Sequence, residues 1–265
     1  MTTLAQKQLA PSVGDESFFL RGAIVMTAFI VAGFSLQLAM SRSTFASPVR
    51  VHAHAFLFMG WVAIYLMQNI FVATGRMSLH KRLGWVAAVW LVPMVVSGFL
   101  VTVAMVRNGT VPFFFRPLQF LIFDPVAILT FAGLTIAAIL LRRQTEWHRR
   151  LHFCGMTILL APAFGRLLPL PLLQPWAWEA AFAVTLLFPM TGAWSDVRRR
   201  GGVHPAWIWG IAVITASFAV TQAMTYSPLG TSIYDVVTEG YPGAAIDPLG
   251  FPSPPAGPQI TGRTH

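Results

Sequence analysis

Residues 83–106 read LGWVAAVWLVPMVVSGFLVTVAMV, an unbroken run without a charged side chain. This run is longer than the roughly 20 apolar residues that a helix needs to cross the hydrocarbon core of a bilayer. Further runs with at most one charged side chain lie at 22–39, 51–73, 118–141, 151–170, 177–194 and 206–224. The sequence therefore predicts an all-α fold, a polytopic membrane bundle of about seven transmembrane helices.

The composition agrees with a membrane protein. Of the 265 residues, 55% are hydrophobic and only 10% are charged, whereas soluble domains carry about 25% charged residues. The net charge of +9 is gathered in short clusters between the apolar runs, which favours contact with membrane lipids over nucleic acid. The single cysteine, Cys154, excludes an intrachain disulfide and an all-cysteine metal site.

The basic residues predict the orientation of the chain. Lysine and arginine are enriched in cytoplasmic loops, and here they cluster in three alternate loops, as Arg76, Lys81 and Arg82, then Arg142, Arg143, Arg149 and Arg150, then Arg198, Arg199 and Arg200. We therefore expect a multi-pass protein of the cell inner membrane with a cytoplasmic N-terminal segment at 1–21. The bundle would span 22–224, and 225–265, rich in proline and glycine and without an apolar period, would form an extended extracytoplasmic tail.

Two histidines open the second predicted span on its outer side. His52 and His54 are two residues apart, so a helix turns them about 200° away from each other. One of them can therefore face the bundle interior as a ligand, while the other caps the helix, forms a hydrogen bond or meets water. Imidazole is a common ligand of metal ions and of haem.

Two basic stretches resemble each other and indicate an internal repeat. One is LHKRLGW at 79–85 and the other is WHRRLHF at 147–153, each at the cytoplasmic start of a span. His80 and His148 occupy matching positions, and His148 and His152 share a helix face because they are four residues apart. These three histidines are candidate cofactor ligands or headgroup-level anchors.

An acidic residue inside the fourth span is a second candidate site. Asp124 precedes Pro125 in an apolar run, where an unpaired carboxylate is costly and usually functional. The repeat offset and the helix rise place Asp124 and His54 at nearly the same depth. They could form a metal site for copper, iron or zinc. One of the outer arginines, Arg116, Arg50 or Arg166, could pair with Asp124 or hold a haem propionate.

The second span also resembles a known family. Residues 52–61, HAHAFLFMGW, resemble the helix of haem–copper oxidase subunit I that carries an axial haem ligand, and they are similar to the His-rich helix openings of NnrS-type haem proteins. The resemblance implies a haem-binding protein of a respiratory chain, with His54 or His52 as the ligand. The chain has fewer spans than the oxidase and no copper-site histidines, so oxygen reduction and proton pumping are not expected.

These observations lead to three functional hypotheses. The first is a haem- or metal-binding membrane protein in electron transfer or redox sensing, with haem b as the cofactor. The second is a non-catalytic subunit or assembly factor of a respiratory or photosynthetic complex, and the third is a small proton-coupled transporter. The sequence carries none of the short hydrolase, nucleotide-binding or metalloprotease motifs, and it leaves open whether the protein is an enzyme.

Overall fold

The computed structural model describes the backbone of residues 13–257 and the side chains of residues 17–257. Helices dominate this range, which confirms the predicted all-α fold. In chain order the elements are α1 (Val13–Ala39), α2 (Val49–Ala73), α3 (Met77–Arg107), α4 (Pro117–Leu140), α5 (Thr145–Ile158), α6 (Ala161–Leu167), η1 (Leu170–Leu173), α7 (Ala177–Arg200), α8 (Pro205–Thr225), α9 (Pro228–Thr238) and η2 (Pro242–Ala245).

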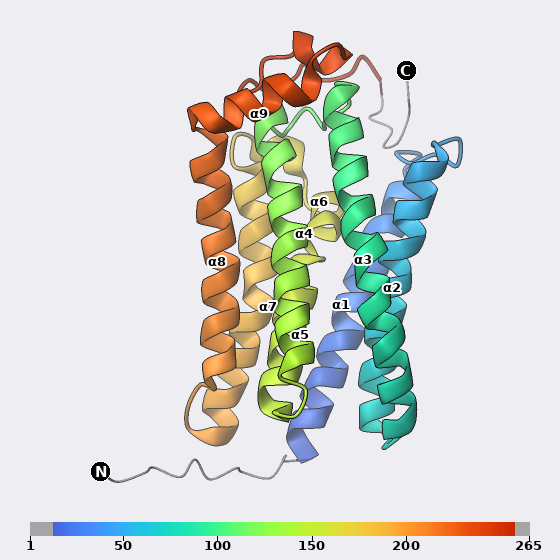
Figure 1. Cartoon of the computed structure of the whole chain (residues 1–265), viewed down its shortest axis with the longest axis vertical. Coiled ribbons are helices and arrows are strands. Elements are labelled where there is room, and N and C mark those ends of the chain that lie inside the picture. Colours follow the sequence, from blue (N-terminus) through green and yellow to red (C-terminus); the bar gives the residue numbers. More distant parts are fainter. Residues whose placement is uncertain (1–12, 258–265) are drawn as a thin grey trace.

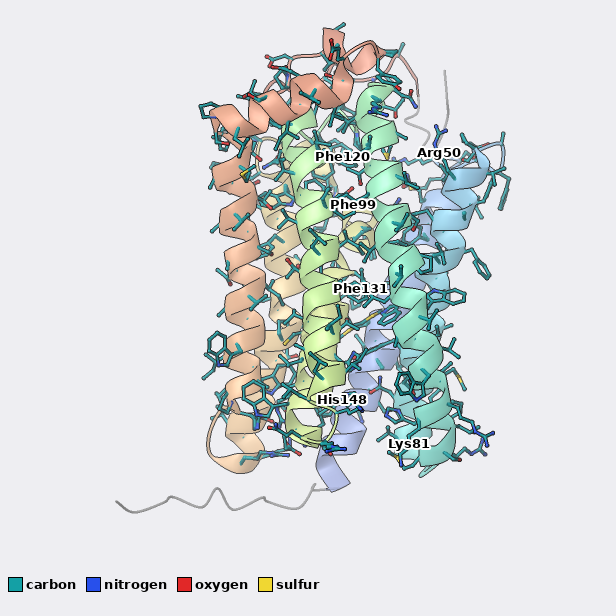
Figure 2. All side chains as sticks on the ribbon, viewed as in Figure 1. Arg50, Lys81, Phe99, Phe120, Phe131 and His148 are labelled. Carbon is teal, nitrogen blue, oxygen red and sulfur yellow. The ribbon has the colours of Figure 1, made fainter. Side chains whose placement is uncertain are left out.

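The long helices stand side by side along one axis (Figure 1). The loops after α2, α4 and α7 all lie at the lower end of the view, where α1 begins, and α9 lies across the upper end. We call these the basic end and the capped end. The three basic loops therefore share one end of the bundle, as the sequence predicts. Figure 2 shows His148 and Lys81 near the basic end, and Arg50 and Phe120 near the capped end.

The face of α3 that turns away from the bundle is apolar. Its stripe of large exposed side chains recurs every three to four residues and consists of Trp85, Val89, Val92, Val96 and Leu100. The opposite face of α3 buries Ala87, Leu91 and Met94 inside the bundle. A helix that is apolar on both faces is typical of a lipid environment, because exposure of the outer apolar stripe to water would be energetically unfavourable. The protein is therefore a polytopic membrane protein.

Six helices of the described chain are long and apolar enough to cross a membrane, namely α1 from Ser17 onward, α2, α3, α4, α7 and α8. The predicted helix at 151–170 is not among them, so the predicted count of seven helical spans is not confirmed. The chain leaves the helical path at Leu159 and Leu160 between α5 and α6. The cause is Pro162, which lacks an N–H group and whose ring would clash with the carbonyl four residues earlier. Together α5 and α6 still lead the chain from the basic end toward the capped end (Figure 1).

The expectation of an extended tail without helical periodicity is wrong for residues 228–238, which form α9. Tyr234 of α9 is buried and donates a hydrogen bond to the Gly243 carbonyl at 3.0 Å. Arg107 at the end of α3 donates from Nε to the Val237 carbonyl at 2.9 Å, and the Leu118 amide donates to the Pro248 carbonyl at 2.9 Å. The segment after α8 is thus an ordered cap on the ends of α3 and α4.

The hydroxyl of Tyr234 gives a test of this cap. We expect Tyr234→Phe to lower the free energy of unfolding by about 1 kcal/mol, because the Gly243 carbonyl loses one of its two hydrogen-bond donors and keeps only the Ile246 amide. Thermal unfolding in detergent micelles measures the change. Tyr241→Phe is the matched control, since Tyr241 is exposed and its ring, which lies 4.6 Å from the Arg107 guanidinium, is retained. Equal stability of the two variants would contradict a structural role for the Tyr234 hydroxyl.

Candidate functional site: a cavity near the capped end

A cavity of about 1110 Å³ lies in the half of the bundle nearer the capped end. Side chains from each of the helices α1 to α8 line it, and α5 and α6 meet at its wall. Most of the lining is apolar, and its aromatic members include Phe58, Phe115, Phe120, Phe123, Trp178, Phe182 and Phe218. Because the wall is mainly apolar, the polar side chains that enter it decide what the cavity can bind.

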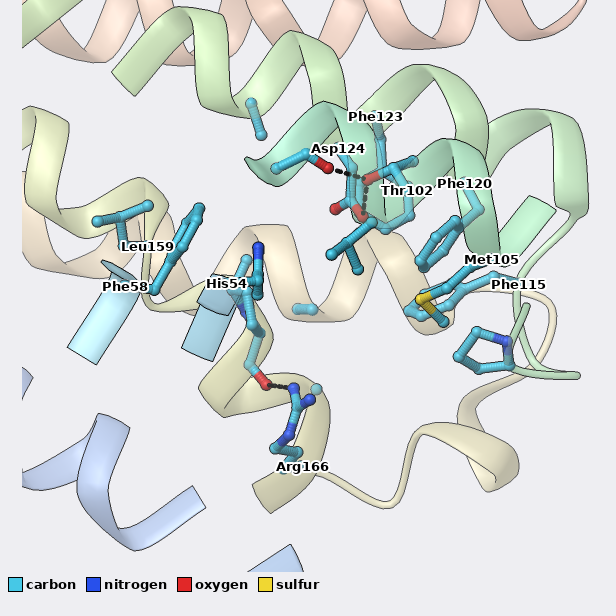
Figure 3. Close-up of a pocket in the computed structure, with 18 of the residues that line it drawn as sticks. His54, Phe58, Thr102, Met105, Phe115, Phe120, Phe123, Asp124, Leu159 and Arg166 are labelled. Atoms are coloured by element: carbon cyan, nitrogen blue, oxygen red, sulfur yellow. Dashed lines mark hydrogen bonds between the residues drawn. The ribbon is translucent and has the colours of Figure 1, made fainter. Parts of the chain in front are cut away.

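His54 enters the cavity from α2 (Figure 3). Its ring stacks on Phe58, with 4.2 Å between the ring centroids and 29° between the planes. Nδ1 of His54 is buried and has no hydrogen-bond partner. His52 is exposed at the mouth, where its Nε2 lies 3.1 Å from the Phe45 carbonyl oxygen. The two histidines thus point in different directions, as the helical spacing predicts: His54 faces the cavity, and His52 lies at its mouth.

Asp124 of α4 reaches the same cavity, so the structure brings together the two residues that the repeat places at one depth (Figure 3). The hydroxyl oxygen of Thr102 lies 3.1 Å from Asp124 Oδ2 and 3.0 Å from the Gly98 carbonyl oxygen. Among the described side chains Asp124 forms no ion pair. Its one polar anchor is therefore a hydroxyl on the neighbouring helix α3.

The third ionisable group is Arg166, which α6 carries into the cavity wall (Figure 3). One terminal nitrogen donates to the Pro162 carbonyl at 2.7 Å, and the guanidinium carbon lies 4.1 Å from the centroid of the Phe34 ring. Nε of Arg166 is buried without a partner. A guanidinium with unused donors beside an apolar chamber suits a carboxylate or phosphate of a ligand.

Arg116, which the sequence suggests as a partner of Asp124, lies elsewhere. It precedes α4 at the capped end, donates a hydrogen bond to the Tyr226 hydroxyl, and its guanidinium carbon lies 4.8 Å from the centroid of the Phe251 ring. It is not part of the cavity lining. Arg166 shares the cavity with Asp124, and Arg42 and Arg50 line its mouth. The position of Arg166 follows from the break between α5 and α6, which Pro162 causes.

The other three candidate histidines gather near the basic end. The ring centroids of His148 and His152 are 4.8 Å apart, and those of His80 and His148 are 6.1 Å apart. His148 Nδ1 lies 2.7 Å from the Ala138 carbonyl oxygen, whereas His80 Nδ1 is buried without a partner. The two histidines at matching positions of the repeat therefore meet in space, on the opposite side of the membrane from His54.

His204 has a structural role at the start of α8. Its Nδ1 accepts a hydrogen bond from the Ala206 amide at 3.1 Å and thereby caps the start of α8. Burial lowers the pKa of His204 below its usual 6.5, with the nearby Arg150 charge as the second cause. The ring therefore stays neutral and can accept this bond.

The described residues contain no group of three or more histidine, cysteine, aspartate or glutamate side chains placed to hold a metal ion. Fold and site together define the class: a polytopic helical membrane protein with a large, mainly apolar cavity into which the imidazole of His54, the carboxyl of Asp124 and the guanidinium of Arg166 project. Comparison with family models, with curated proteins and with solved structures gives no match to this chain. The resemblance of residues 52–61 to haem-binding helices therefore stays a prediction.

Proposed function

We propose that the protein binds a b-type haem in the cavity near the capped end, with His54 as the axial ligand. The observation that carries the proposal is the His54 imidazole on the wall of an aromatic chamber of about 1110 Å³ (Figure 3). Drug-sized and cofactor sites are typically concave, mainly apolar chambers of roughly 300–1,000 Å³ with a few fixed polar groups. In this proposal the protein serves electron transfer or redox sensing in the cell inner membrane, with the basic end in the cytoplasm.

The donor set favours haem over a bare metal ion. A zinc site built from protein groups alone needs three or four ligands, and no such group exists among the described residues. A porphyrin supplies four nitrogen ligands of the iron, so the protein needs to supply only one or two more. His54 can supply one of them, and Met105, which also lines the cavity, carries the thioether that could supply a second. The same argument disfavours a two-residue site made of His54 and Asp124.

The other ionisable side chains fit the acid groups of such a ligand. Haem carries two propionates, and Arg166 has a buried Nε without a partner on the cavity wall. Arg42 and Arg50 line the mouth of the same cavity. When bound, haem would supply a one-electron iron couple. The chain would fix the iron through His54, hold the propionates through arginine, and keep water from the macrocycle with its aromatic wall.

An absorption spectrum tests the proposal. We expect detergent-purified protein from haem-replete cells to show an intense Soret band, and His54→Ala to reduce the haem content per protein to background. His52→Ala is the matched control, because His52 lies two residues away, is exposed and already contacts the Phe45 carbonyl. A colourless wild-type preparation, or equal haem content in the two variants, would overturn the assignment.

One observation favours a second candidate function, proton-coupled transport. The break between α5 and α6 lies in the cavity wall, where Ile158, Leu159 and Pro162 line the chamber. Transporters commonly build their substrate sites from discontinuous membrane helices, and Asp124 supplies a carboxyl at the same level. Uptake of an organic anion into proteoliposomes, lost in Asp124→Asn but kept in Asp235→Asn on the exposed face of α9, would support transport over haem binding.

A further inference from the structure

A second hollow, of about 560 Å³, opens at the basic end. The first turns of the membrane-crossing part of α1 form one wall, the last turns of α7 form the other, and Phe153 of α5 contributes to the lining. Deeper in the bundle the two walls meet, where the Phe29 and Phe188 rings have centroids 6.0 Å apart. The result is a groove between α1 and α7 that opens toward the basic end; we call it the α1–α7 groove.

Glycine at position 22 keeps this groove open. A Cβ atom added to Gly22 would lie 2.5 Å from a ring carbon of Phe153, which is closer than any real contact. The backbone of α1 therefore lies directly against Phe153, and no side chain from this position enters the groove.

The lining of the groove changes from polar to apolar along its depth. Arg21 and Arg199 lie toward the basic end with Ser195, whereas Val25, Leu187 and Phe188 lie farther from the chain's basic loops. Arg21 is exposed, and Arg199 donates from Nε to the Ser195 carbonyl at 3.3 Å. Two cationic groups above an apolar slot match the two parts of a lipid, an anionic headgroup and an acyl chain.

The depth of the groove in the membrane agrees with this pattern. Trp194, exposed on the last turns of α7, lies under the Arg198 guanidinium, whose carbon is 4.5 Å from the ring centroid. Tryptophan side chains concentrate at the level of lipid headgroups. Arg199, one residue beyond Arg198 in the same turn, therefore lies at headgroup level, and Leu187 lies more than three turns deeper, in the acyl-chain region.

We infer that the α1–α7 groove binds an anionic phospholipid of the leaflet at the basic end. Arg21 and Arg199 would contact the phosphate, and one acyl chain would lie along Val25, Leu187 and Phe188. Basic pockets between membrane helices on the cytoplasmic side commonly bind anionic headgroups. The inference does not depend on the ligand of the larger cavity, because the two hollows share no lining residue.

Native mass spectrometry of the detergent-purified, delipidated protein tests the inference. Phosphatidylglycerol is expected to bind with one tight site, and phosphatidylcholine of the same chain length is expected to bind at least about tenfold more weakly, because it carries no net charge. Arg21→Gln and Arg199→Gln should each weaken phosphatidylglycerol binding by about fivefold, since each juxtamembrane arginine contributes about 1 kcal/mol. Leu187→Trp, which narrows the apolar slot, should weaken binding of both lipids.

Arg143→Gln is the matched control. Arg143 is exposed in the loop after α4 at the same end of the bundle, so its loss changes the net charge equally but leaves the groove intact. Unchanged binding in Arg21→Gln and Arg199→Gln, or an equal loss in Arg143→Gln, would overturn the inference. So would complete displacement of phosphatidylglycerol by millimolar inorganic phosphate, because a site that needs the acyl chain would not yield to the free anion.

Discussion

Arg150→Ala is expected to lower the free energy of unfolding by about 3–5 kcal/mol, because it leaves a buried carboxylate without its partner. Arg150 is fully buried, although it stands in a run of basic residues. Its Nε and one terminal nitrogen donate to the two oxygens of Asp196 at 2.9 and 2.8 Å, a bidentate pair between α5 and α7. Its other terminal nitrogen bonds Glu146, one turn earlier in α5.

The pair also involves a third helix. Trp207 of α8 is fully buried and donates from Nε1 to Asp196 Oδ2 at 3.0 Å. Removing the guanidinium therefore disturbs the contacts among α5, α7 and α8 at once. The helix α5 is short, and the chain leaves the helical path directly after it. This ion pair is therefore the main polar contact that fixes the position of α5 relative to α7 at the basic end.

Chemical denaturation in mixed micelles measures the change. Arg143→Ala, in the exposed loop before α5, should alter the unfolding free energy by less than about 0.5 kcal/mol. A double variant, Arg150→Met with Asp196→Leu, should recover much of the lost stability, because replacing both members of a buried pair by apolar groups removes the unpaired charge. A single variant as stable as the wild type would show that water reaches Asp196 and that the pair is not buried.

Gly192→Leu is expected to destabilise the bundle by about 1–3 kcal/mol or more, through overpacking between α7 and α8. A Cβ atom at Gly192 would lie 2.3 Å from the Trp207 ring. The ring cannot move aside without breaking its hydrogen bond to Asp196. Close approach of two helix backbones through a glycine is a common way to pack membrane helices.

Gly133→Leu is the matched control for this variant. Gly133 is exposed in the middle of α4, and a Cβ atom there would meet no atom within 4 Å. The two variants carry the same substitution and differ only in what surrounds the new side chain. Unfolding in micelles should therefore show a clearly lower free energy of unfolding for Gly192→Leu than for Gly133→Leu. If both variants unfold alike, helix propensity and not packing decides the effect.

The positions of the six long helices could be predicted from the sequence, although α1 begins nine residues before the predicted run and α3 and α7 each extend six residues beyond theirs. The run at 83–106 lies inside α3 (Met77–Arg107), and the run at 118–141 nearly coincides with α4 (Pro117–Leu140). Both predictions succeed because transfer of apolar side chains into lipid is a local property of the sequence. The common depth of His54 and Asp124 could be predicted for the same reason, since a helix rises by a fixed distance per residue.

Three features escaped the sequence. Arg150 lies in a run of arginines that predicts a loop at the basic end, and only the position of Asp196 on another helix shows that it is buried. The helix α9 lies in a segment rich in proline and glycine, and its apolar face is recognisable only from what it covers. The third feature is the break at Pro162 in the fifth segment, which looked like a continuous span. Arg166 was among the outer arginines that the sequence offered to Asp124, but its place on the cavity wall depends on this break.

The amino-acid sequence by itself determined which segments enter the lipid, which loops lie together and how deep each ionisable residue lies, because these depend on hydrophobicity and on a constant rise per residue. Only the tertiary structure decided which ionisable groups meet. Rotation of each helix about its axis is set by packing against its neighbours, and that rotation turns His54, Asp124 and Arg166 toward one chamber while it leaves Arg116 with Tyr226 at the capped end.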